Sequence, residues 1–267
     1  MHMTASDDQT SGVKLSRRRL LGVGIGGSVI AVASAAAGLN TGMNIEARPM
    51  RGREDFDQKA REIYDRHWLQ DEETVRTLRA KYQSPVFGRV RVWDLVEKLA
   101  LCVDPTDRTL YCANQYIHVQ QILEGMERDR INDNELILAA LVHDLGKVAL
   151  LTDEVPENVV CGTGPVAEYG EGAGLDNIYC QFGHDEIAYS RIKDHVPDFV
   201  AWLTRYHSMQ PEEMVSYLNE RDRDYYDKYL TFRRYDLGTK SAAALPHVNM
   251  DKYREIVEAA FPSPIAF

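Results

Sequence analysis

The sequence predicts an all-α fold, and three observations support that prediction. Apolar residues recur at helical spacings through most of the chain after residue 56; between Asp251 and Ala260, for example, Tyr253, Ile256 and Val257 share one face. No segment shows the alternation of apolar and polar residues that a half-buried strand requires. Stretches rich in Asp, Asn, Gly and Pro separate the helical segments. With 267 residues, 44% of them hydrophobic, we expect one well-packed domain and a tail.

The helical periodicity assigns most of the folded part. The expected helices begin at Phe56 and then cover Val92–Val103, Ala113–Arg128, the apolar stretch from Leu136 to Gly146, Gly183–Ile192, Pro197–Ser208, Arg221–Arg234 and Asp251–Ala260. Asn132-Asp133-Asn134 can cap the helix that follows. The segment from Pro156 to Gly174 is rich in Gly and Pro, and loops of that length in compact domains are usually functional.

The N-terminus has the form of a twin-arginine export signal. Ser16-Arg17-Arg18-Arg19-Leu20-Leu21 precedes a weakly hydrophobic run from Leu20 to Leu39, in which Ala33-Ser34-Ala35 suits a signal peptidase. The run is also long enough to span a membrane if it is not cut. The sequence therefore predicts an exported protein, on the periplasmic or extracellular side, carried folded by the twin-arginine machinery and then released or anchored.

The signal implies a three-part chain. We expect a signal or anchor over residues 1–39, a polar linker over residues 40–55 and a single helical domain over residues 56–267. The formal net charge of −10 argues against nucleic acid as a partner, because phosphate binding favours a basic surface. The four cysteines contain no CxxC pair, which argues against a cysteine zinc site. Their disulfide pairing is left open; the cysteines are Cys102, Cys112, Cys161 and Cys180.

The stretch from Leu136 to Leu151 carries the strongest functional signal. It is almost continuously apolar, yet His143 and Asp144 lie side by side within it, followed by Gly146 and Lys147. Burying an unpaired carboxylate beside an imidazole costs several kcal/mol, so the pair is either held in a hydrogen-bonded network or binds a metal ion. A metal ion requires further donors elsewhere in the chain. Gly146 would let the backbone approach the bound group closely.

Four imidazoles and two carboxylates are the candidate donors. They are His118, His143, Asp144, His184, His207 and Asp236. This mixture suits iron, manganese or zinc and does not suit copper(I) or an iron–sulfur cluster. His118 alone would be read as a satisfied core histidine. The remaining folded-part histidines, His67, His195 and His247, have polar surroundings in the sequence, and we assign them no metal role.

Several motifs in order resemble those of the inositol oxygenases, which belong to the HD superfamily. They are HDLGK (His143 to Lys147), GLDN and GHDE between Gly174 and Glu186, RYHS (Arg205 to Ser208) and YDLGTK (Tyr235 to Lys240). The resemblance covers about residues 58–267. It implies a helical HD-type domain with a mixed-valent Fe(II)/Fe(III) pair. The implied ligands are the six candidate donors, with Asp144 bridging and with His184 and His207 on the second iron.

The resemblance also implies the chemistry. In the family a vicinal diol chelates one iron, dioxygen binds the other, and hydrogen is removed from a substrate carbon before the ring opens. Lys147 and Lys240 match positions that contact the substrate and take part in catalysis, and Ser208 matches a further substrate contact. The implied function is a non-heme diiron oxygenase that uses O2 on a small chelating molecule.

Two departures and two alternatives stay open. Leu101 and Gly162 stand where the family has acidic residues, so the substrate can be inositol, another polyol or a molecule with a different chelating pair. The first alternative is an HD-type metal-dependent phosphohydrolase. It would need a basic cluster near the metals, for which Arg205, Arg233 and Arg234 are the candidates. The second is a non-catalytic metal-binding module.

Overall fold

The computed structural model describes residues 52–161 and 164–267, and these residues confirm the all-α prediction. The α-helices are α1 (Arg53–His67), α2 (Glu72–Lys81), α3 (Val92–Lys98), α4 (Gln115–Arg128), α5 (Asn134–Val142), α6 (His184–Ile192), α7 (Asp198–Tyr206), α8 (Pro211–Met214), α9 (Glu220–Gly238) and α10 (Asp251–Ala260). The 3-10 helices are η1 (Leu99–Leu101), η2 (Leu145–Leu151), η3 (Pro156–Asn158) and η4 (Leu175–Asn177). The predicted signal and most of the predicted linker lie outside the described residues.

Side-chain caps explain where several helices begin. The carboxylate of Asp71 accepts a hydrogen bond from the Thr74 backbone N–H at the start of α2. Asp133 accepts from two backbone N–H groups in the first turn of α5. At α9, Asn219 and Asp222 form a reciprocal capping box. Such caps satisfy N–H groups that have no partner within the helix, and each contributes about 1 kcal/mol.

Among the helix ends that differ from the sequence prediction, two place a candidate donor. The central helix α5 ends at Val142 instead of Gly146, and the chain continues as the 3-10 helix η2. Helix α9 continues to Gly238, beyond the predicted end at Arg234, because its buried face extends through Tyr235 and Asp236. Asp236 therefore lies within a helix and not after it.

A short antiparallel pair was not predicted. Strand β1 (Arg89–Val90) pairs with β2 (Ile265–Ala266), which holds the end of the chain beside the segment that leads into α3. Strands of two residues are too short to show a period in the sequence. Among the described residues, no helix combines the length and hydropathy needed to cross a lipid bilayer.

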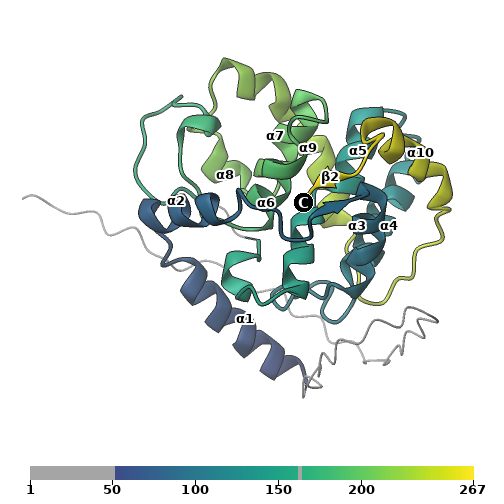
Figure 1. Cartoon of the computed structure of the whole chain (residues 1–267), viewed down its shortest axis with the longest axis horizontal. Coiled ribbons are helices and arrows are strands. Elements are labelled where there is room, and N and C mark those ends of the chain that lie inside the picture. Colours follow the sequence, from purple (N-terminus) through teal and green to yellow (C-terminus); the bar gives the residue numbers. More distant parts are fainter. Residues whose placement is uncertain (1–51, 162–163) are drawn as a thin grey trace, which may run out of the picture. The chain divides into compact units, whose positions relative to one another are not determined.

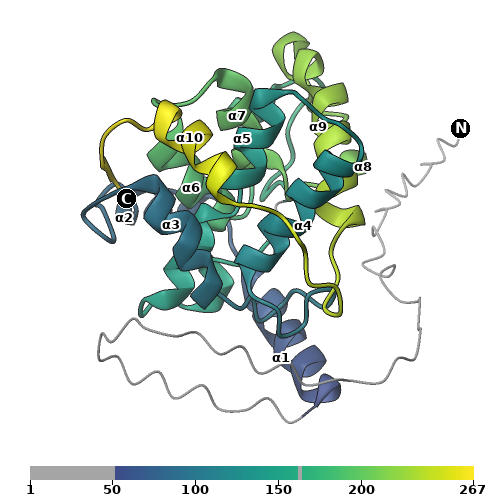
Figure 2. The same cartoon turned by 90° about the vertical axis from the view of Figure 1, so that its right-hand side faces the viewer.

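Helix α5 lies at the centre of the packing. Almost all of its residues are buried, and it packs against α4, α7, α9 and α10. Figure 2 shows α10 beside α3 and in front of α5, in agreement with the contacts between these helices. Helix α6 packs on α7 and on η2, whereas α1 lies at the edge of the helical domain in Figure 1. The ends of α5, α6 and α7 therefore meet next to α4 and α9.

One prediction near α1 needs correction. His67, expected in polar or solvent-facing surroundings, is fully buried, and its Nδ1 lies 2.7 Å from the carbonyl oxygen of Glu157. This contact fixes α1 against the chain at η3, so His67 has a structural role. Trp68, which directly follows α1, is 56% exposed. The four cysteines form no disulfide.

Candidate metal centre

The structure brings all six candidate donors together in the interior. His118 comes from the middle of α4, His143 and Asp144 follow α5, His184 begins α6, His207 follows α7 and Asp236 lies near the end of α9. Each is at most 4% exposed. Donor atoms lie close enough together to hold a metal ion in three overlapping sets: His118 with His143 and Asp236, His143 with Asp144 and His207, and His184 and His207 with Asp185, which is not one of the six.

The carboxylate of Asp144 lies between two groups of imidazoles. Its Oδ2 lies 3.4 Å from Nε2 of His143 and 3.9 Å from Nε2 of His118. Its Oδ1 lies 3.0 Å from Nε2 of His184 and 3.6 Å from Nε2 of His207. Each oxygen thus has its own pair of ring nitrogens, which is the arrangement that a carboxylate bridging two metal ions needs.

Two of the donor atoms have no hydrogen-bond partner within residues 52–161 and 164–267, which also fits metal binding. Nε2 of His143 is buried and has no hydrogen-bond partner among the described residues, and Oδ2 of Asp144 accepts no hydrogen bond of ordinary geometry. Buried polar atoms are normally paired, and two such atoms that face one another are suited to share a bound metal ion. Asp236 supplies a second carboxylate on this side, since its Oδ1 lies 2.9 Å from Nε2 of His118.

Backbone carbonyl groups orient three of the imidazoles. Nδ1 of His143 lies 3.1 Å from the Ala140 oxygen, Nδ1 of His184 lies 3.0 Å from the Val159 oxygen, and Nδ1 of His207 lies 3.0 Å from the Thr204 oxygen. A proton on Nδ1 leaves Nε2, which is directed at Asp144, with a free electron pair for a metal ion. Metal-binding histidines commonly have this second contact, which fixes both the tautomer and the ring plane.

The electrostatics of the metal-free site favour a charged carboxylate of Asp144 beside a neutral ring of His143. Burial raises the pKa of Asp144, but His143 and Lys147 outweigh that effect and hold it well below its usual range. Burial lowers the pKa of His143 to about 3, despite the neighbouring carboxylate of Asp144. A neutral imidazole and an ionised carboxylate are the protonation states that metal binding requires.

Lys147 lies beside the bridge-forming carboxylate and is held from three directions. Its Nζ lies 3.2 Å from Oδ2 of Asp144 and 3.2 Å from Oδ2 of Asp104, and it donates to Oε1 of Gln115 at 3.0 Å. Lys147 and Asp104 are each 1% exposed. Burial lowers the pKa of Lys147, but Asp144 and further acidic groups raise it well above its usual range, so the amine stays charged.

Lys240 occupies the corresponding place beside Asp236. Its Nζ lies 3.6 Å from Oδ1 of Asp236 and 3.2 Å from Oδ2 of Asp107. The other oxygen of Asp107 accepts hydrogen bonds from the backbone N–H groups of Thr109 and Leu110, which fixes the carboxylate. Both lysines predicted to contact substrate therefore reach the centre, and an aspartate from the turn before α4 holds each of them.

Sequence reasoning missed four polar residues of this site. They are Asp104, Asp107, Gln115 and Asp185. Asp185 could have been found, because it directly follows His184 in the motif GHDE. Its Oδ1 accepts a hydrogen bond from Ser208 Oγ at 2.8 Å and lies 2.9 Å from Nδ1 of His207. Ser208, a predicted substrate contact, thus lies next to the second pair of histidines.

Two glycines permit the close packing behind the donors. A Cβ at Gly146 would lie 2.0 Å from the carbonyl oxygen of His184, and one at Gly183 would lie 2.6 Å from that of Val160. The expectation that Gly146 allows a close approach is therefore correct, but the partner is the backbone of α6.

The two residues that depart from the family resemblance differ in what can be said of them. Leu101 is 62% exposed, and Gly162 lies outside the described residues.

Comparisons with known proteins agree with this geometry. The sequence model of the family described as Myo-inositol oxygenase matches residues 57–168 and 158–267. Inositol oxygenase 4 of Arabidopsis thaliana is 28% identical over 262 residues, which cover 82% of this chain and 80% of the plant protein. A probable inositol oxygenase of Oryza sativa subsp. japonica is 27% identical and covers 74% of this chain and 77% of its own.

The similarity extends to animal proteins. The inositol oxygenase of Bos taurus is 27% identical over 219 residues, covering 68% of this chain and 76% of its own. Enzymes of this family depend on iron, which matches the nitrogen and oxygen donors gathered around Asp144. The chain is therefore an oxygenase and a divergent member of the myo-inositol oxygenase family.

Proposed function

We propose that this chain is a diiron oxygenase that uses O2 to oxidise a small polyol or another chelating molecule, with cleavage of a carbon–carbon bond. The observation that carries the proposal is the position of Asp144, whose two oxygens face two separate pairs of imidazoles. One ion would be held by His118, His143, Asp236 and Oδ2 of Asp144. The other would be held by His184, His207 and Oδ1 of Asp144.

A mixed-valent Fe(II)/Fe(III) pair would supply the redox chemistry and the attachment points for substrate and dioxygen. Two ions would suit this reaction because one could orient the substrate while the other is available for dioxygen. The buried surroundings of the six donors exclude bulk water and strengthen every electrostatic contact. This chain's own residues must then bind the substrate, hold its charge and place its protons.

The two lysines are placed for those tasks. Lys147 lies 3.2 Å from the proposed bridge, and Lys240 lies 3.6 Å from the second carboxylate of the first ion. A buried ammonium group can stabilise negative charge that develops on a substrate oxygen, and it can donate a proton to that oxygen. Ser208 Oγ, 3.4 Å from Nε2 of His207, can bind a further substrate oxygen.

The proposed class of substrate is inferred from the residues around the two lysines. Asp104 and Asp107 each form an ion pair with one of the two lysines. They are therefore not free acceptors for additional hydroxyl groups. Leu101 is exposed, and its side chain offers no hydrogen-bond acceptor. We include inositol, other cyclic and linear polyols and related chelating molecules in the proposed range.

A phosphohydrolase function is less well supported, because two of the three arginines named for it, Arg205 and Arg233, are engaged elsewhere. Arg205 forms two contacts with Glu186, at 2.8 and 3.2 Å, and one with Asp176 at 2.8 Å. Arg233 donates to the Met209 carbonyl and to the Tyr229 hydroxyl. With their donors committed, these side chains are poorly placed to bind a phosphate beside the metals.

Anaerobic reconstitution with ferrous iron provides the test. The expected result is two irons per chain and O2 consumption that depends on one member of a panel of inositol isomers, sugar alcohols and related molecules. His143→Ala serves as the inactive control. Hydrolysis of a phosphoester without O2, or protein that binds no iron under these conditions, would contradict the proposal.

Export remains part of the proposal, supported by the order of the arginine cluster, apolar run and small residues between Ser16 and Ala35. Twin-arginine transport moves folded cargo, which suits a protein whose metal donors come from helices throughout the domain. Cell fractionation of the wild type and of the double variant Arg17→Lys/Arg18→Lys tests it. We expect the variant to stay in the cytoplasm; equal distribution of both proteins would contradict export by this route.

A further inference from the structure

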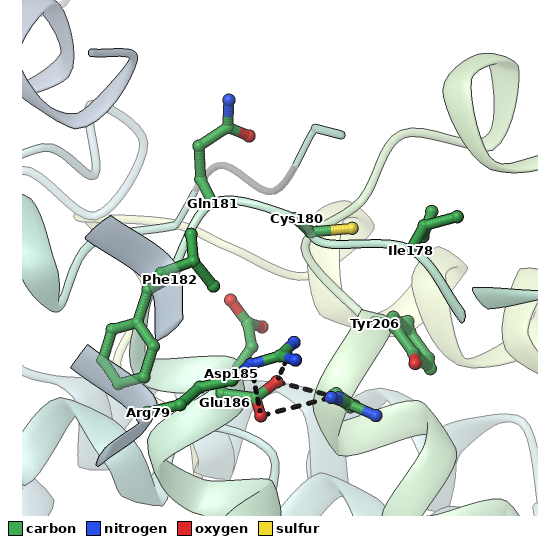
Figure 3. A pocket seen from close by; sticks show the side chains of 10 residues that line it. Arg79, Ile178, Cys180, Gln181, Phe182, Asp185, Glu186 and Tyr206 are labelled. Atoms are coloured by element: carbon green, nitrogen blue, oxygen red, sulfur yellow. Dashed lines mark hydrogen bonds and ion pairs between the residues drawn. The ribbon is translucent and has the colours of Figure 1, made fainter. Parts of the chain in front are cut away.

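A small pocket lies behind the second pair of histidines, and Asp185 connects the two. The pocket is lined by Arg79, Cys180, Gln181, Asp185, Glu186 and Tyr206, among others. Figure 3 shows the carboxyl group of Asp185 directed into it, next to the ion pairs of Glu186. Asp185 is 1% exposed, and its Oδ2 has no hydrogen-bond partner among the described residues.

The other oxygen of Asp185 has three neighbours, all at the candidate metal centre. Oδ1 accepts a hydrogen bond from Ser208 Oγ at 2.8 Å and lies 2.9 Å from Nδ1 of His207 and 3.5 Å from Nε2 of His184. One carboxylate oxygen thus touches an imidazole expected to bind the second ion and the hydroxyl group expected to bind substrate. The backbone of Thr204 provides the only other contact of Nδ1 that the described residues show.

A buried carboxylate with a purely structural role would normally have partners for both of its oxygens. Burying a carboxylate costs several kcal/mol, and natural structures normally offset that cost by pairing both oxygens. Asp222, equally buried in this protein, illustrates the usual case: Oδ1 accepts from the Trp202 indole N–H, and Oδ2 accepts from the backbone of Leu175. Asp185 leaves one oxygen unsatisfied and commits the other to the centre.

We propose that Asp185 is a positioning residue that fixes the ring of His207 on the second metal ion and the hydroxyl group of Ser208 on the substrate. The inference rests on the proposed diiron function. A carboxylate behind a metal-binding histidine fixes the ring orientation and makes the imidazole a stronger ligand, and its loss typically weakens metal affinity or activity by about 10- to 100-fold. Sharing Oδ1 with Ser208 links substrate binding to the same group.

Two substitutions of Asp185 separate its charge from its shape. Asp185→Asn keeps an acceptor oxygen but removes the negative charge, and Asp185→Ala removes both contacts. Asp222→Asn is the matched control, because it changes an equally buried carboxylate that contacts none of the six donors. Ser208→Ala removes only the hydroxyl group, so it isolates the effect on substrate.

The first readout is iron release to a ferrous chelator from fully loaded protein, which requires no turnover. In Asp185→Asn we expect one of the two irons to leave about 10-fold faster or more, and in Asp185→Ala faster still, while Asp222→Asn releases both at the wild-type rates. The second readout is steady-state kinetics. We expect Ser208→Ala to raise KM without changing iron release, and both Asp185 variants to change KM and iron release together.

Three results would overturn the inference. Wild-type release rates and KM in both Asp185 variants would show that the carboxylate does not act on the centre. Complete loss of one iron at saturating ferrous iron would make Asp185 a ligand itself. Equal effects in Asp222→Asn would show a general loss of packing. If wild-type protein binds no iron, the proposed function fails first, and the two failures are therefore distinguishable.

Discussion

Asp104 and Lys147 form an ion pair in the protein interior, with 3.2 Å between Oδ2 and Nζ and with each residue 1% exposed. Asp104 Oδ1 accepts hydrogen bonds from the backbone N–H and the hydroxyl group of Thr106. The turn before α4 thus holds a lysine against the carboxylate that we propose bridges two irons. The ion pair thereby connects the turn before α4, whose sequence suggests no function, to the proposed reaction centre.

Breaking the pair on one side should cost more than replacing both partners. Lys147→Met leaves Asp104 as a buried charge without its cation, which we expect to lower the free energy of unfolding by about 3–5 kcal/mol. The double variant Asp104→Asn/Lys147→Met should recover part of that loss. Urea unfolding of the metal-free proteins measures both. A double variant less stable than Lys147→Met would show that the pair is not coupled.

His143→Ala should remove iron and activity together, because its Nε2 is a buried donor without a hydrogen-bond partner in the described part of the chain. His195→Ala is the control, since His195 is exposed and lies outside the centre. Elemental analysis after anaerobic loading gives the iron content. A full complement of iron in His143→Ala would remove this residue from the ligand set.

Lys240→Ala should keep its iron and lose turnover, because a charged ammonium group cannot itself be a metal ligand and Lys240 only contacts the carboxylates of Asp236 and Asp107. We expect a loss in kcat of at least about 100-fold, as found when a positioned acid–base group is removed. Lys193→Ala, which changes an exposed lysine, should be unaffected. Oxygen uptake and iron content, measured on the same sample, distinguish the two effects, and near-normal turnover would contradict the role.

Gly146→Ala should displace His184, because the new Cβ would lie 2.0 Å from that residue's carbonyl oxygen. The backbone of α6 must move, so we expect lower stability and loss of the second iron in preference to the first. Gly170→Ala is the control, because nothing lies within 4 Å of the added carbon. Iron stoichiometry and the melting temperature report the outcome; two tightly bound irons in Gly146→Ala would show that the contact relaxes without consequence.

The metal-free protein should lose stability as the pH rises above neutrality. Burial lowers the pKa of His207, but Asp185 and Asp144 outweigh that effect and raise it from 6.5 to about 10. The bound proton therefore stabilises the fold fully below pH 6.5, and this contribution disappears as the pH rises toward 10. Iron must displace the same proton, so its affinity should increase over this range.

Urea unfolding and anaerobic iron titration between pH 6 and 9 test both slopes. His207→Gln, which has no titrating ring, should reduce both dependences. An iron affinity that falls with increasing pH in the wild type would contradict the assigned protonation state.

The spacing of apolar residues predicted the bounds of a helix well where one face of the helix is exposed along its whole length. The bounds of α10, Asp251 to Ala260, were predicted as observed for this reason. It failed at Gly146, because α5 and the following 3-10 helix are both buried on all sides and their apolar patterns do not differ. The paired strands β1 and β2 were missed because two residues carry no period.

His143 and Asp144 could be singled out as candidate donors because adjacent histidine and aspartate residues are unusual in an apolar segment. Asp107 was not predictable, because its sequence context is that of a turn. One of its oxygens does cap the turn through Thr109 and Leu110, while the other binds Lys240, and the first role conceals the second. Local sequence shows a residue's short-range partner, whereas Lys240 arrives from the far end of the chain.

The first set of donors pairs His118 with Asp236, which are 118 positions apart in the chain. During synthesis α9 emerges last among the donor-bearing helices, so a nascent chain that ends before it lacks a carboxylate on this side. Under the proposed assignment, the first iron can therefore gain all of its protein ligands only after α9 has been synthesised and folded, although α10 and β2 are still to follow.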